Sequence, residues 1–259
     1  MRIISLNASF GQNLERLLDF ITQEAADTDV FCFQEVFFGG IPQFSKETQV
    51  RLNLYSEISP KLPGFKGIEF LAPAYAKYYR FELLPEDAHP GLAIFVKQGF
   101  KVLDTGGFPT YRNIPTGMNF GALLTGNCQW VRLIDDQGEE LTIMHIHGIY
   151  QRDTDKADTP ERQEQSRILL DFIKNCGTKV VLLGDFNLLP NTKSIEILGE
   201  SLLNLIRKYG ITDTRGRRYA GPIRFADYCF ISKEIKERTF RAIDSEASDH
   251  LPLELEYYV

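Results

Sequence analysis

Short apolar runs alternate with amphipathic and polar segments along the whole chain. Runs rich in β-branched and aromatic residues predict strands at 2–6, 30–33, 92–96, 100–103, 129–134, 141–146, 179–183, 227–231, 238–243 and 251–257. Apolar residues at helical spacing predict a helix at Leu14, Leu17, Leu18, Ile21 and Ala25. The polar stretch over 43–58 is also compatible with a helix. Many strands and few helices favour an α/β fold in which two sheets pack face to face with helices outside.

The clearest predicted helix covers residues 160–174. Thr159 can cap its first turn, Pro160 suits its first position, and Gly177 lies just past its end. No repeat, low-complexity tract or change of composition interrupts the chain. We therefore expect residues 1–259 to form a single domain.

Composition and charge narrow the class of protein. The 259 residues are 43% hydrophobic and 25% charged, as in an ordinary globular protein. A net charge of −6 argues against a basic field over the whole surface for nucleic acid, but it is compatible with a local basic groove. The four cysteines lack metal-site spacing and fit reduced thiols. Because no signal-peptide core or membrane-length apolar run is present, we expect a cytoplasmic protein with no membrane span and no obligate protein partner.

Polar side chains recur where the predicted strands meet loops. Asp185 directly follows the apolar run 180–183, and Asp249 and His250 immediately precede the run that begins at residue 251. Further candidates at strand ends are Asn7, Glu35, His147, Asn187 and Asp227. Any one of them could be an ordinary turn or capping residue. Because so many strands end in the same chemistry, the set indicates a metal-assisted hydrolase with its site at the rim of a sheet.

A basic segment lies between residues 213 and 227. It contains four arginines with no acid among them, namely Arg215, Arg217, Arg218 and Arg224. The segment either grips additional phosphates, since a guanidinium matches phosphate oxygens, or is a solvated loop whose charges do little. Arg215 and Arg218 are candidate phosphate-binding residues, and Arg112, in a Gly/Pro-rich loop, is a weaker one.

The polar motifs resemble those of the endonuclease/exonuclease/phosphatase superfamily, which includes deoxyribonuclease I, exonuclease III-type enzymes and inositol polyphosphate 5-phosphatases. The matching blocks follow the family order and span essentially the whole chain: Ser5-Leu6-Asn7, Gln34-Glu35, the strand end at His147, Gly184-Asp185-Phe186-Asn187, Asp227-Tyr228 and Ser248-Asp249-His250. The resemblance implies a four-layer α-β-β-α sandwich with two mainly antiparallel or mixed sheets, which agrees with the predicted strands.

The resemblance also implies a metal. Glu35 would be the main Mg²⁺ ligand, with Asn7 and Asp249 contributing, and Mn²⁺ could replace Mg²⁺. A hard cation that keeps several waters needs only one or two carboxylates plus phosphate oxygens.

The remaining matched residues would act on water and phosphate. Asp185 would orient or deprotonate the attacking water, helped by Asn187. His250, with its tautomer fixed by Asp227, would bond a phosphate oxygen or transfer a proton. His147 would be a second phosphate ligand that stabilises the transition state.

Two positions depart from the exonuclease III-type pattern. His147 stands where tyrosine is usual, and Ser9 stands where a second Asp commonly follows Asn7. Both differences favour the histidine-bearing branches over abasic-site repair. His145 would share a face of a regular strand with His147, and we interpret it as a satisfied structural residue or a partner of the site.

The sequence thus predicts a magnesium-dependent phosphoesterase that hydrolyses a phosphodiester or phosphomonoester by in-line attack of water. Its partner is a phosphate-ester substrate, either a small molecule, which needs only a pocket, or a nucleic acid, which needs a basic groove. The acidic balance favours the small substrate, and the arginine segment favours a nuclease. A non-catalytic binding module is the third alternative, and the presence of Glu35, Asp185 and His250 speaks against it.

Overall fold

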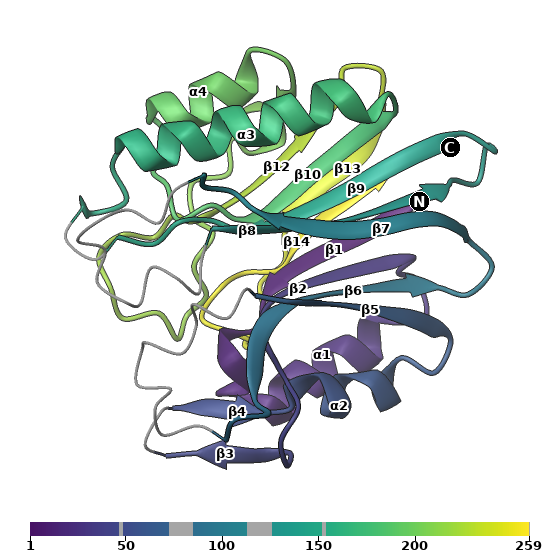
Figure 1. Cartoon of the computed structure of the whole chain (residues 1–259), viewed down its shortest axis with the longest axis vertical. Coiled ribbons are helices and arrows are strands. Elements are labelled where there is room, and N and C mark those ends of the chain that lie inside the picture. The colour runs from purple at the N-terminus through teal and green to yellow at the C-terminus, as the bar shows by residue number, and fades with distance from the viewer. Residues whose placement is uncertain (47–48, 73–84, 113–125, 152–153, 259) are drawn as a thin grey trace.

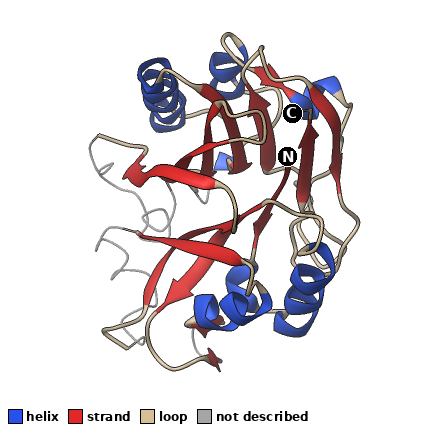
Figure 2. Cartoon of the chain, turned by 90° about the vertical axis from the view of Figure 1, so that its right-hand side faces the viewer, coloured by secondary structure: helices blue, strands red, loops and turns tan. Residues whose placement is uncertain are grey.

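Two six-stranded sheets pack face to face, and helices cover the outer side of each (Figure 1). The same four layers are visible after a quarter turn, with helices on the two outer sides and strands between them (Figure 2). The computed structural model describes residues 1–46, 49–72, 85–112, 126–151 and 154–258. The layering confirms the α/β class and the four-layer arrangement that the sequence predicts.

The two sheets contain strands from both halves of the chain. The first sheet runs in the order β13 (Glu237–Ala242), β14 (Leu253–Tyr257), β1 (Arg2–Asn7), β2 (Val30–Phe38), β6 (His89–Lys97) and β5 (Phe65–Leu71). The second runs in the order β11 (Leu203–Asn204), β12 (Asp227–Ile231), β10 (Lys179–Asp185), β9 (Glu140–His147), β8 (Asn127–Ile134) and β7 (Lys101–Pro109). The helices are η1 (Ser9–Gly11), α1 (Leu14–Glu24), α2 (Leu54–Ile58), η2 (Ser59–Lys61), α3 (Pro160–Cys176), α4 (Lys193–Gly199) and α5 (Leu205–Lys208).

Each sheet contains one parallel pair of strands among antiparallel neighbours. In the first sheet β1 is parallel to β2, and in the second β9 is parallel to β10. Parallel strands need a long crossover, and the helices α1 and α3 provide it. The carboxyl ends of a parallel pair lie at one edge of the sheet, so each crossover brings the polar residues after its two strands together.

The strands are apolar on both sides because both faces of each sheet are covered. Ile3 belongs to a core cluster that includes Ile143 of the second sheet, whereas the adjacent Ile4 packs in a cluster with Leu17 of α1. Continuous apolar runs, rather than strict alternation, are therefore what these strands require.

The ends of α3 agree with the sequence. The Thr159 hydroxyl accepts a hydrogen bond from the Arg162 amide at 3.3 Å, and Gly177 adopts the left-handed conformation at φ 66°. Pro160 occupies the first turn. No helix in the described ranges is long and apolar enough to cross a membrane.

The prediction of a helix over 43–58 is wrong for most of that stretch. It forms a hairpin of β3 (Gln43–Ser45) and β4 (Val50–Leu52), and only α2 is helical. Val50 and Leu52 are buried and two residues apart, which is strand spacing. Asn53, at φ 48°, then accepts a hydrogen bond from the Ser56 amide and starts α2.

Candidate active site

The candidate residues gather at the edge of the two sheets where the parallel pairs end. His147, Asp185 and Asp227 lie on three adjacent strands, and Asp185 pairs in register with each of the other two. Asn7 ends β1 in the opposite sheet, and its Nδ2 donates a hydrogen bond to Asp185 Oδ2 at 3.1 Å. The hydrogen bond between Asn7 and Asp185 therefore joins the edges of the two sheets.

A β-bulge places Glu35 at this edge. The pairing of β2 with β6 shifts between Phe33 and Val36, so the register is irregular there. Glu35 lies at this irregularity with a φ of 57°. This is a left-handed conformation that residues other than glycine rarely adopt. A bulge re-aims a side chain out of the regular alternation of a strand. As a result Glu35 Oε1 lies 3.4 Å from His147 Nε2.

The carboxylate of Asp185 is the centre of the cluster. Besides its contact with Asn7, its Oδ2 lies 3.9 Å from His147 Nε2 and 3.7 Å from His250 Nε2. Its Oδ1 accepts a hydrogen bond from the Asn187 amide at 2.8 Å. Asn187 has a left-handed φ of 53°, and its side chain donates to the Gly148 carbonyl at 3.2 Å. The loop after β10 thus folds back to hold the carboxylate from behind.

Burial and charge act against each other on Asp185. Burial raises its pKa, but nearby groups lower it well below its usual value: His250, His147, Lys156 and Arg215. Asp185 therefore stays ionised in a buried setting, because positive groups compensate its charge.

Asp227 fixes the orientation of His250. The imidazole Nδ1–H donates to both carboxylate oxygens of Asp227, at 3.0 and 2.9 Å. Nε2 contacts the Arg215 guanidinium. In a neutral imidazole this nitrogen accepts a hydrogen bond from the guanidinium. Burial lowers the pKa of His250, yet Asp227 and Asp185 raise it above its ordinary value overall.

Arg215 connects several parts of the cluster. Its Nη1 also donates to Asp249 Oδ2 at 3.2 Å, and its guanidinium lies 4.4 Å from the centre of the Tyr219 ring. Its Nε is buried and has no hydrogen-bond partner in the described part of the chain. Burial lowers its pKa, but Asp185, Asp227 and Asp249 raise it overall, so Arg215 remains a cation.

Burial shifts the pKa values of Glu35 and His147 in opposite directions, because it disfavours the charged form of each group. Burial raises the pKa of Glu35 to about 7; His250 and Asn7 lower it, whereas the carboxylates of Asp249 and Asp185 add to the rise. Burial lowers the pKa of His147 to about 4, although Asp185 acts in the other direction. His147 is therefore neutral near pH 7, and Glu35 lies among carboxylates whose charge a cation would balance.

Lys156 is a residue of the site that the sequence did not single out. It is 6% exposed, and its Nζ donates to the Phe225 carbonyl at 2.9 Å. Burial lowers its pKa to about 8, while Asp185 and Asp227 act to raise it. The mixed-charge stretch that contains it follows the His147 strand and is typical of a loop at the edge of an active site, but no local pattern reveals that Lys156 is buried.

His145 is a satisfied structural residue, as the sequence suggested. Its Nδ1 accepts from Gln34 Nε2 at 2.9 Å, and its Nε2 donates to Gln129 Oε1 at 2.8 Å. Burial lowers its pKa to about 3, so it is neutral in the folded protein.

The arginines predicted to bind phosphate lie in three different settings. Arg215 is inside the cluster, and Arg218 is exposed and lines a hollow of about 160 Å³ that also includes Asp249. Arg112 is not brought together with them. Its Nε lies 3.8 Å from Glu164 of α3, in a groove between α3 and α4.

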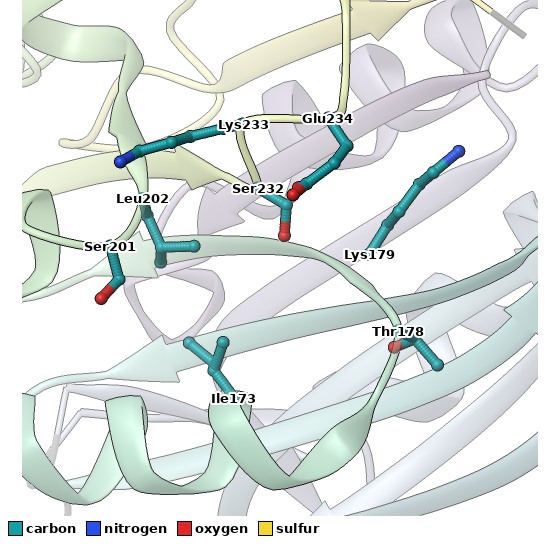
Figure 3. Close-up of a pocket in the computed structure, with 8 residues that line it drawn as sticks. All are labelled: Ile173, Thr178, Lys179, Ser201, Leu202, Ser232, Lys233 and Glu234. Atoms are coloured by element: carbon teal, nitrogen blue, oxygen red, sulfur yellow. The ribbon is translucent and has the colours of Figure 1, made fainter.

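A larger hollow of about 340 Å³ lies at the opposite end of β10 (Figure 3). Lys179 lines it, and Lys179 and Asp185 are the first and last residues of that strand, which puts them about 20 Å apart. The Lys179 ammonium is paired with Glu139. This hollow is therefore separate from the candidate active site.

Comparison with known proteins places the chain among relatives of the same fold. A mannosyl-6-phosphatase of Bacteroides thetaiotaomicron is 18% identical, with a TM-score of 0.72 and 100% of each chain covered. TDP2 of D. rerio, complexed with a single-stranded DNA product, is 16% identical, with a TM-score of 0.70 over 100% of this chain and 99% of that one. The human Nocturnin catalytic domain with bound sulfate is 18% identical, with a TM-score of 0.67 over 100% and 93%. A search of curated proteins found no significant match.

A family model matches the chain over residues 4–250, from the middle of β1 to the histidine of the cluster. That range contains every residue of the site described above. The chain therefore belongs to the Endonuclease/Exonuclease/phosphatase family.

Proposed function

We propose that this protein is a magnesium-dependent phosphoesterase that hydrolyses a phosphodiester or phosphomonoester. The observation that carries the proposal is the buried Asp185 carboxylate, with Asn7, His147 and His250 within 4 Å of its Oδ2. An ionised carboxylate beside two imidazoles can orient a water toward a phosphorus atom while the imidazoles bond the phosphate oxygens.

The donors around Glu35 fit a divalent cation. Glu35, Asn7 and Asp249 offer oxygen ligands, which Mg²⁺ prefers, and the raised pKa of Glu35 reflects its burial first and the neighbouring carboxylates second. Asp185, Asp227 and His250 also place ligand atoms within 4.8 Å of one another. A cation on the Glu35 side leaves the hydrogen bonds between His250 and Asp227 intact, so we favour that side. A bound cation would polarise the phosphoryl oxygens.

The protein's own groups divide the remaining work. Nearby positive groups lower the pKa of Asp185 and keep it ionised, so it would accept a hydrogen bond from the attacking water and orient it. His250, held by Asp227 through Nδ1, would donate from Nε2 to a phosphate oxygen in its protonated form, which the raised pKa of the imidazole favours. His147, neutral near pH 7, donates a second hydrogen bond.

The preferred substrate is a small phosphate ester, and a nuclease is the second candidate. Arg218 supports the second candidate, because it has no carboxylate partner among the described residues and lines the same hollow as Asp249. A phosphodiester strand would use such a free cation.

The test is hydrolysis of a substrate panel by the purified protein, with Mg²⁺ and with chelator. The panel holds single- and double-stranded DNA, RNA, an aryl phosphodiester, an aryl phosphomonoester and inositol phosphates. We expect turnover that needs Mg²⁺ and falls by about 10²-fold or more in Asp185→Asn. Turnover by Asp185→Asn equal to that of the wild type would overturn the proposal.

A further inference from the structure

The hollow beside Asp249 is bounded by the chain on both sides of the site. Ser9 and Asn13 follow Asn7 of β1, and Ser248 and Asp249 precede His250. Arg218 closes the hollow from the arginine segment. With a volume of about 160 Å³ it has room for one small polar group.

Arg218 is the free cation of its segment. Arg215 is paired with Asp249, and Arg217 and Arg224 are paired with Asp244 and Asp213. Within the described ranges Arg218 has no such partner. A guanidinium that no carboxylate neutralises can accept an anion.

Two hydroxyls on the same hollow are also free. Neither Ser9 Oγ nor Tyr219 Oη has a hydrogen-bond partner in the part of the chain that the structure describes. The one acid on the wall, Asp249, is already engaged by Arg215. The hollow therefore offers donors to an anion, and its acid is compensated.

We propose that this hollow binds a second phosphate group of the substrate, next to the phosphate that is hydrolysed. The proposal rests on the proposed function and narrows it to substrates with two phosphates, either a nucleic-acid strand or a small bisphosphate. The stacking of Arg215 on Tyr219 and its contact with His250 link the hollow to the reaction centre. Arg218 would contact a group that does not react, so it would contribute to binding rather than to the chemical step.

The test compares thymidine 5′-(p-nitrophenyl phosphate) with the same compound carrying a 3′-phosphate. Arg218→Gln should raise KM about fivefold to tenfold for the doubly phosphorylated compound and leave kcat unchanged. On the singly phosphorylated compound it should have no effect. Arg217→Gln, an exposed neighbour paired with Asp244, is the matched control and should have no effect on either. The inference would be overturned if Arg218→Gln raised KM equally for both compounds, or if it left KM for the doubly phosphorylated compound unchanged.

A binding measurement separates this inference from the proposed function. In Asp185→Asn, calorimetry should give a tighter Kd for thymidine 3′,5′-bisphosphate than for thymidine 5′-monophosphate, and adding Arg218→Gln should remove the difference. If the wild type hydrolyses neither aryl ester, the proposed function fails for these substrates, and the binding result still decides the inference. Equal Kd values for the two nucleotides would overturn it. Competition by a DNA tetranucleotide and by an inositol bisphosphate then distinguishes the two sources of the second phosphate.

Discussion

Individual residues at the edge of the sheets are held by partners on other strands. Asp185 is bonded by Asn7 from the opposite sheet and by the backbone of Asn187. His250 is held by Asp227. Because each group is fixed before substrate arrives, little reorganisation is needed during the reaction.

Lys156 should matter for the chemical step. Lys156→Met removes a buried positive charge that interacts with Asp185 and frees the Phe225 carbonyl ahead of β12. We expect kcat to fall about tenfold, equivalent to about 1.4 kcal/mol, with KM within about twofold. Steady-state kinetics on the best substrate of the panel measures both. Lys179→Met, at the far end of β10, is the control, and the same kcat loss in both variants would contradict a role at the site.

His145 should make stability depend on pH. Its pKa is about 3 when folded, below its usual value, so the unfolded chain takes up the proton first. The contribution of His145 is complete above about pH 6.5 and is lost by about 1.4 kcal/mol per pH unit as the pH falls toward 3. Urea unfolding with chelator present should show a shallower pH dependence below about pH 6 in His145→Gln than in the wild type. Parallel curves for the two proteins would refute this.

The types of the site residues could be predicted from the sequence, but some of their partners could not. Asp185 and His250 stand beside apolar runs, and the family order of the motifs supports them. Lys156 and the pairing of Arg215 with Asp249 depend on loops that meet only in the folded chain. Arg112 was assigned from charge alone, and its neighbour is Glu164.

Among the helices and strands, the crossovers decide where the chemistry gathers. The strand pairs joined by α1 and α3 could be predicted because their apolar runs are long and continuous. The strand β5 was missed because its residues are partly exposed and include Gly67, as suits a strand at the edge of a sheet. The bulge at Glu35 depends on register with β6, which no local pattern encodes.

Gly184 has no space for a side chain. Its φ is 125°, and an added Cβ would lie 2.4 Å from the Ile146 carbonyl oxygen. Gly184→Ala should therefore lower the free energy of unfolding by about 2–4 kcal/mol, measured by urea denaturation. Gly199→Ala is the control, since nothing lies within 4 Å of a Cβ there. Equal free energies of unfolding for the two variants would contradict this prediction, because they would mean that β9 and β10 can move apart to accept the methyl group.

Over the molecule as a whole, the two ends of the chain meet in one sheet. The Met1 amino group donates to the Tyr257 carbonyl at 3.1 Å, and β1 pairs with β14. Arg2 is paired with both Glu24 and Glu254. Because the first sheet needs both termini and the site needs both sheets, we propose that residues 1–259 form one domain.

One domain should unfold in one step. Urea unfolding followed by far-UV and near-UV circular dichroism should give coincident transitions, since the sheets share a core. Two separated transitions would contradict the proposal.

Metal-assisted hydrolysis is decided by the Mg²⁺ dependence of turnover in the wild type and in Glu35→Gln. We predict no turnover of the wild type in chelator and recovery with added Mg²⁺. In Glu35→Gln the Mg²⁺ concentration for half-maximal activity should rise about tenfold or more. Glu196→Gln, an exposed substitution on α4 beside Lys193, should respond like the wild type. Full activity of the wild type in chelator, or identical Mg²⁺ dependence in Glu35→Gln, would contradict a metal held by Glu35.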